Sequence, residues 1–214
     1  MRRLAVITLA MSVSLAVSAQ SVLDLARRGT VEQLRAAIAS GADVNETAAN
    51  GWTPLMLAVR DNGDVQVIRM LLHFGARLTD RDALGHTPFM IALYHDALPP
   101  IIRALLEAGA AVEDQDRFGW TPFMLAAINS SSPAVISMLV TAGASANEKR
   151  SDGKTPLMLA AQWNMHPEVV EAIIAAGARI DDTDFEGRKA LDYAEDNNSL
   201  KGSQVTQRLR GSGH

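Results

Sequence analysis

A six-residue phrase returns along this chain at a constant interval, and no other feature restricts the possible folds so strongly. The phrase Gly-x-Thr-Pro-Leu/Phe-Met has its prolines at Pro54, Pro88, Pro122 and Pro156, a step of 34 residues. A Gly-Ala pair keeps the same step at 41–42, 75–76, 109–110, 143–144 and 177–178. Alanine follows each of these prolines by four places. Three markers with one period indicate a repeated structural unit, so we expect one elongated array of stacked units.

The first complete unit shows what each block is expected to form. Thr53 can cap a helix whose first position is taken by Pro54, where a missing N–H has no cost. The turn-forming residues 61–63 end this short helix, and the apolar residues of 65–73 recur at the spacing of a second helix. Gly75 supplies the left-handed conformation that ends helices. Neither helix is long enough to be stable alone, so each unit must bury its apolar side against its neighbours.

This unit resembles the ankyrin repeat, whose signature is a Thr-Pro-Leu-His-x-Ala helix start in a block of about 33 residues. The resemblance implies an all-α solenoid of stacked helix-turn-helix units with projecting loops. Gly187 and Ala194 keep the register near the C-terminus, where Lys189-Ala190 replaces Thr-Pro and Asp192 replaces methionine, as expected of a polar capping repeat. The expected divisions are an N-terminal cap at 20–50, full repeats at 51–84, 85–118, 119–152 and 153–186, a C-terminal cap at 187–210, and a disordered tail at 211–214.

Two departures from the ankyrin pattern stand out. The signature histidine, which in the family ties neighbouring loops by hydrogen bonds, is replaced by Met56, Met90, Met124 and Met158. We expect these methionines to fill space between stacked units, and a metal-binding or oxidation-sensing stripe is the alternative. The full units are also one residue longer than the family standard, with the extra residue between the two helices. It is either a harmless loop variant or a change that reshapes the rim beside the groove.

The first 19 residues differ from the rest of the chain. Arg2 and Arg3 precede an apolar run of 14 residues, Leu4 to Val17, and small residues end at Ala19. This order predicts a signal peptide at 1–19, and the run is shorter than the roughly 18 residues of a membrane-spanning helix. An uncleaved anchor is the alternative. Cleavage changes the net charge from −4 to −6, and no insertion into a membrane is expected afterwards.

The chain contains no cysteine, so an exported form must be held together by its core alone. Together with the short leader, this favours a bacterial periplasmic location, and secretion from the cell is the alternative. The negative net charge and the absence of a Lys/Arg cluster argue against nucleic acid as a partner.

The sequence offers little for catalysis, a cofactor or a metal. No cysteine nucleophile, phosphate-binding loop or Gly-x-Ser-x-Gly motif is present, so the protein is predicted not to be an enzyme. His86 and His95 could approach each other through the repeat geometry, but without a carboxylate partner they make a weak metal site. The acidic residues Asp80, Asp82 and Asp181-Asp182 fall in connectors, where we expect solvated turn residues. No cofactor and no metal is expected.

The resemblance implies binding of a protein partner through the loop tips and the exposed side of each first helix, which line a concave face. All three tryptophans fall at these positions although aromatic residues are only 5% of the chain, and such residues dominate binding energy at interfaces. The alternative for Trp52 and Trp120 is packing along the neighbouring loop. We expect an unidentified protein partner and a monomeric chain. The predicted contacts are Trp52, Arg60, Asp61, His86, Tyr94, His95, Phe118, Trp120, Asn129, Lys154, Gln162 and Trp163, with Leu84, Ile128, Phe185 and Arg188 in the same register.

Overall fold

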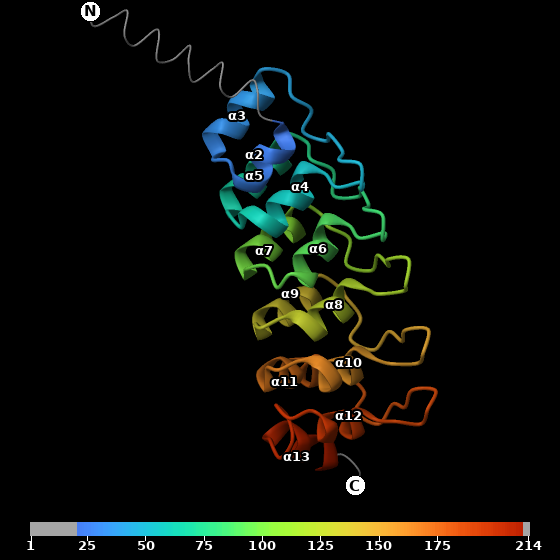
Figure 1. Cartoon of the computed structure of the whole chain (residues 1–214). Coiled ribbons are helices and arrows are strands. Elements are labelled where there is room, and N and C mark those ends of the chain that lie inside the picture. The colour runs from blue at the N-terminus through green and yellow to red at the C-terminus, as the bar shows by residue number, and fades with distance from the viewer. Residues whose placement is uncertain (1–20, 212–214) are drawn as a thin grey trace, which may run out of the picture.

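The computed structural model describes residues 21–211. The signal peptide predicted at 1–19 lies outside this range, as do residues 212–214 of the predicted tail. Gly211, which was also assigned to that tail, is instead the last residue of a helix. Within the described range the chain forms twelve α-helices and one π-helical turn, with no strand. None of the helices in this range is both long and apolar enough to cross a membrane. The helices stack in two columns and the loops project to the same side (Figure 1).

Each unit contributes two short helices, one to each column. The first helices are α2 (Val22–Arg28), α4 (Pro54–Leu57) with its continuation η1 (Ala58–Asn62), α6 (Pro88–Tyr94), α8 (Pro122–Asn129), α10 (Pro156–Trp163) and α12 (Ala190–Asp196). The second helices are α3 (Val31–Ala39), α5 (Val65–His73), α7 (Pro99–Glu107), α9 (Pro133–Thr141), α11 (Pro167–Ala175) and α13 (Gln204–Gly211). Consecutive first helices contact one another, as do consecutive second helices. The expected all-α repeat solenoid is therefore confirmed.

The repeated Thr-Pro begins each of the four central first helices. The threonine hydroxyl accepts a hydrogen bond from the backbone N–H three residues later, at 3.2–3.3 Å in all four units. The C-terminal cap lacks this threonine, and the Asp192 carboxylate there accepts from the backbone N–H of Lys189 at 2.7 Å. The second helices α3, α5, α7, α9 and α11 each end before a glycine in the left-handed conformation, as at Gly75 with a φ of +86°.

The methionines that replace the signature histidine lie inside the core. Met56, Met90 and Met124 are fully buried and Met158 is 1% exposed. The alanines four places after each proline are also fully buried, so adjacent first helices can approach closely. The methionines therefore fill space between repeats, as the packing interpretation predicts.

The turns that contain the extra residue tie adjacent repeats together. The side-chain amide of Asn164 donates to the carbonyl oxygens of Ala127 and Ser130 in the preceding repeat, at 2.9 and 3.1 Å. Asn197 makes an equivalent pair of bonds one repeat later, to Ala161 and Asn164. In the first full unit the extra residue is accommodated in the π-helical turn η1. Neither interpretation of the longer turn predicted this role, because it depends on side chains that reach across the repeat boundary.

The stacked loops leave unequal room at two equivalent glycines. Gly153 and Gly119 both have φ near +80°, a conformation that costs a residue with a Cβ roughly 1–2 kcal/mol. A Cβ on Gly153 would lie 2.9 Å from the backbone nitrogen of Phe185, whereas one on Gly119 would meet nothing within 4 Å.

We therefore expect Gly153→Ala to lower the free energy of unfolding by about 1–3 kcal/mol more than Gly119→Ala, since the next loop must move. Urea denaturation of the two variants beside wild type measures this difference. Equal losses would show that the loop of Phe185 does not press on Gly153.

Candidate binding face

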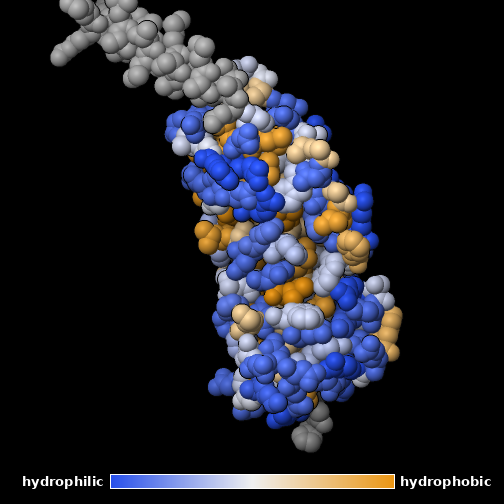
Figure 2. Space-filling model, viewed as in Figure 1, coloured by the Kyte–Doolittle hydropathy of each residue, from blue (hydrophilic) through white to orange (hydrophobic). Residues whose placement is uncertain are grey.

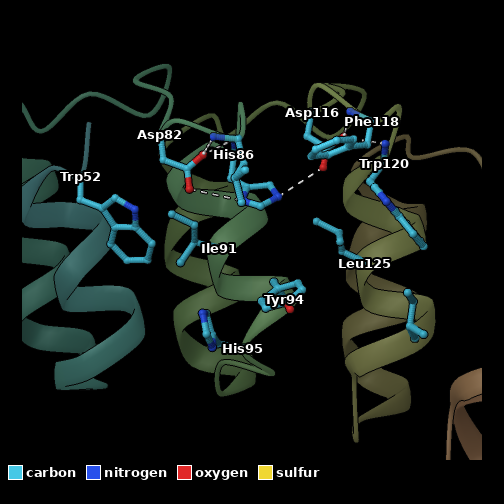
Figure 3. Close-up of a pocket in the computed structure, with 12 residues that line it drawn as sticks. Trp52, Asp82, His86, Ile91, Tyr94, His95, Asp116, Phe118, Trp120 and Leu125 are labelled. Carbon is cyan, nitrogen blue, oxygen red and sulfur yellow. Dashed lines mark hydrogen bonds and ion pairs between the residues drawn. The ribbon is translucent and has the colours of Figure 1, made fainter. Parts of the chain in front are cut away.

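Two adjoining grooves lie along the face formed by the first helices and the projecting loops. The first groove has a volume of about 330 Å³ and lies mainly between the second and third full repeats (Figure 3). The second groove, of about 510 Å³, lies between the third and fourth. The first groove is lined by Trp52, Asp82, Leu84, His86, Ile91, Tyr94, His95, Asp116, Phe118, Trp120, Leu125 and Ile128. The second is lined by Trp120, Ile128, Asn129, Arg150, Lys154, Leu159, Gln162 and Trp163.

Most of the predicted contact residues are brought together in these grooves. Six of the twelve line the first groove: Trp52, His86, Tyr94, His95, Phe118 and Trp120. Five line the second groove: Trp120 again, with Asn129, Lys154, Gln162 and Trp163. Arg60 lines a further pocket next to the N-terminal cap, together with Trp52. Asp61 lines none of these pockets.

Sequence reasoning missed the apolar residues at the bottom of both grooves, and it missed Arg150 in the second groove. Ile91, Leu125 and Leu159 lie three places after the repeat prolines and were not among the predicted contacts. They are only 1–3% exposed, and they line the grooves with the little surface that they leave open. Arg150 lies in a connector, outside the register used for the prediction. The recurring apolar position after each proline was the available signal for the floor.

Exposed aromatic side chains form the walls. Tyr94 is 53% exposed, and Phe118 and Trp163 are each 61% exposed. In Figure 2, apolar surface is interleaved with polar surface over the middle repeats. Aromatic side chains left in water along grooves are typical of surfaces that bind other molecules.

His86 bridges two consecutive loops at the top of the first groove. Its Nδ1 lies 3.3 Å from Asp82 Oδ2, and its Nε2 lies 3.2 Å from Asp116 Oδ2 (Figure 3). The other oxygen of each carboxylate accepts from two backbone N–H groups of its own turn. Both carboxylates are almost fully buried, with side chains 4% and 1% exposed. The ring of Tyr94 stacks on His86, with centroids 6.2 Å apart.

These contacts correct two expectations. Asp82 is a buried loop residue and not a solvated one, because stacking places each loop's carboxylate beside the next loop. For the same reason His86 does have carboxylate partners. Of the other connector acids, Asp181 is 62% exposed, as expected, whereas Asp80 and Asp182 are only about 20% exposed and face Arg77 and Lys149. Within residues 21–211, no three or more potential ligands are placed to hold a metal ion.

Two tryptophans are each covered on one side by an arginine. The guanidinium of Arg60 lies 4.3 Å from the ring centroid of Trp52, and that of Arg150 lies 4.5 Å from the ring of Trp120. Both tryptophans are partly buried against the core and both line a groove. Packing within the chain and exposure to a groove are therefore combined at these positions.

Asp61 is already engaged within the chain. Its carboxylate accepts from Arg60 at 2.6 and 2.8 Å and from Arg27 at 2.9 Å. The hydrogen bonds from Arg60 lower the pKa of Asp61 to about 2, against the opposing effect of burial, and Arg27 adds to them. Partial burial, and then the charge of Arg60, lower the pKa of His95, so its ring favours the neutral form. A contact of Asp61 with a partner stays a prediction.

Replacement of Asp61 by asparagine tests this cluster. The folded pKa lies below the ordinary value of 3.8, so the stabilisation is complete above about pH 4 and is lost as the pH falls through about 2. We expect Asp61→Asn to lower the free energy of unfolding by about 1 kcal/mol at pH 7, since the side chain is still 25% exposed and solvent screens the pair. Between pH 4 and pH 2 the variant should lose less stability than wild type. Denaturant titrations at several pH values check this, and parallel acid profiles would contradict it.

Comparison with known proteins agrees with this architecture. The family profile described as ankyrin repeats (3 copies) matches residues 23–116, 98–184 and 123–204. No curated protein matches the chain. Among solved structures, one chain of the complex described as Bd0816 predatory endopeptidase from Bdellovibrio bacteriovorus in complex with immunity protein Bd3460 is 24% identical and has a TM-score of 0.74, with 90% of this chain and 98% of that chain covered. This likeness shows a shared fold. Because the profile spans nearly all the repeats, the chain belongs to the ankyrin-repeat family.

Proposed function

We propose that this protein is a non-enzymatic binding module that acts in the bacterial periplasm and holds a partner protein on its concave face. The observation that carries the proposal is the row of exposed aromatic side chains along two adjoining grooves. Ankyrin repeats are an interaction scaffold without catalytic activity, which supports the same conclusion. The leader predicted at 1–19 supports export, and the chain is proposed to act as a monomer.

The solved structure with the shared fold suggests a class of partner. It holds an endopeptidase in complex with an immunity protein. We propose by analogy that the partner of this chain is an exported enzyme. Fold likeness alone is a weak guide to targets, so the analogy sets only the first partners to test.

Two tryptophans on the grooves provide the direct test. We expect the double change Trp120→Ala, Trp163→Ala to weaken capture of a partner from periplasmic extract at least 30-fold, because anchor residues at interfaces often contribute about 2 kcal/mol or more each. The mature wild-type chain and the variant serve as paired baits, with bound proteins quantified across bait concentrations. Val140→Ala, on second helix α9 and 37% exposed, is the control and should capture normally.

Circular dichroism should show equal helicity for the three baits, so a loss of capture is not a loss of folding. Unchanged capture by the double variant would place the binding surface elsewhere.

The alternative is a protein released from the cell that binds a host or competitor protein through the same face. Cell fractionation separates the two locations. Recovery from the periplasm supports the first proposal, and recovery from the culture supernatant alone would replace it with the second.

A further inference from the structure

We infer that the two grooves together take one extended segment of the partner, with an apolar or aromatic side chain in the first groove and a carboxylate in the second. This inference rests on the proposed function and names the chemistry that the partner must present. It follows from the different charge character of the two grooves and from the residues they share.

The first groove suits an uncharged side chain. Its floor is Ile91 and Leu125, and Trp52 and Tyr94 stand on its sides (Figure 3). The charged groups on its rim already pair with one another, because His86 takes one oxygen each of Asp82 and Asp116. Their other oxygens accept from backbone N–H groups. All four carboxylate oxygens therefore already have partners, and both carboxylates are almost fully buried, so they are not open to a charged group of a partner. An apolar side chain in this groove would be removed from water.

The second groove has the opposite character. Arg150 and Lys154 line it together with the amides of Asn129 and Gln162, and none of its lining residues is acidic. Arg150 is held by an ion pair with Asp152. This groove therefore presents positive charge and hydrogen-bond donors, and Trp120 and Trp163 line it as well.

Among residues 21–211, no carboxylate forms an ion pair with the amine of Lys154, and its close contacts are with uncharged groups. It donates to Gln162 Oε1 at 2.9 Å and lies 4.6 Å from the ring centroid of Tyr193. The buried carboxylate of Asp184 lies within electrostatic reach of Lys154. That carboxylate already accepts from the Tyr193 hydroxyl and from the backbone N–H groups of residues 186 and 188. A partner carboxylate would give Lys154 a direct charged partner.

One segment can occupy both grooves because they are continuous. Trp120 and Ile128 line both grooves, so they form the boundary that the two grooves share. Neighbouring packed helices lie roughly 8–10 Å apart, so the groove centres are separated by about that distance. An extended chain advances about 3.3 Å per residue, so the apolar and acidic side chains should stand roughly three residues apart.

A library of random short peptides, displayed on phage and selected on the immobilised mature chain, tests this. We expect the enriched peptides to share an aromatic or large aliphatic residue and an Asp or Glu about three places away. A fluorescein-labelled consensus peptide should bind Lys154→Gln about tenfold more weakly than wild type, measured by fluorescence polarisation. Lys201→Gln, an exposed lysine of the C-terminal cap, is the matched control and should bind as wild type does.

Changing the peptide's acid to its amide should weaken binding to wild type by a similar factor, and should cause little further loss with Lys154→Gln. The comparison of the two peptides on wild type uses the unmodified protein, so it holds even if the variant is unstable. Enriched peptides without an acidic residue, equal binding by Lys154→Gln and wild type, or no enrichment at all would overturn the inference. A different result would contradict the proposed function: capture of the natural partner that is unchanged by the double tryptophan substitution.

Discussion

Truncation of Phe123 to alanine is expected to lower the free energy of unfolding by about 3–5 kcal/mol. Phe123 is 1% exposed and lies on α8, which contacts α6, α9 and α10. Each repeat is stable only through contacts with its neighbours, so a cavity in a central repeat weakens the interfaces on both of its sides. A change of this size is a large part of the total stability of a domain.

The adjacent loop provides the matched control for this prediction. Phe118→Ala removes the same atoms as Phe123→Ala. Phe118 is 61% exposed, so its ring contributes little to the packing of the folded chain. We expect it to change the free energy of unfolding by no more than about 0.5 kcal/mol. Equilibrium unfolding in urea, followed by circular dichroism, measures both variants. Comparable losses in the two would mean that Phe123 is not part of the packed core.

The second large effect is expected for Asn164→Ala, at about 2–4 kcal/mol. Asn164 is 1% exposed, and its amide donates to two carbonyl oxygens of the preceding repeat. Its own side-chain oxygen accepts from the backbone N–H of His166 at 2.8 Å. Alanine would leave the two carbonyl oxygens buried without their partner, which costs about 1–3 kcal/mol for each such group, whereas the part-buried N–H of His166 can bond to water. Because the lost bonds join two repeats, unfolding should also become less cooperative, with the C-terminal repeats unfolding first.

Asn147 tests whether the loss of stability depends on the burial of the hydrogen bonds or only on their number. It also joins two repeats, with one bond to the carbonyl of Gly177 and one from the N–H of Arg179, but these bonds are exposed to water. We expect Asn147→Ala to lose about 1 kcal/mol or less, since water can replace the missing partner. Urea unfolding gives the stabilities, and hydrogen exchange of α11 reports the uncoupling of the repeats. If Asn147→Ala were as damaging as Asn164→Ala, burial would not explain the effect.

The candidate site was predictable to the extent that it follows the repeat register. Positions counted from each glycine and proline located the tryptophans, Tyr94 and Lys154 on the grooves. The same counting could not find Arg150, whose side chain lies over Trp120 from the connector of the same repeat. Nor could it show that Asp61 is shared by Arg27 and Arg60, because Arg27 belongs to the preceding repeat.

The sequence by itself determined the repeat unit, because the interactions that define it are local. A threonine hydroxyl reaches the N–H three residues later, proline fits the first helical position, and glycine allows the positive φ after the second helix. Only the tertiary structure decided what joins one unit to the next. The bridge of His86 between Asp82 and Asp116, the bonds of Asn164 to the preceding turn, and the continuity of the grooves at Trp120 all cross a repeat boundary. Most of these partners stand about one repeat apart along the chain, so their contact depends on how the units stack and not on any local pattern.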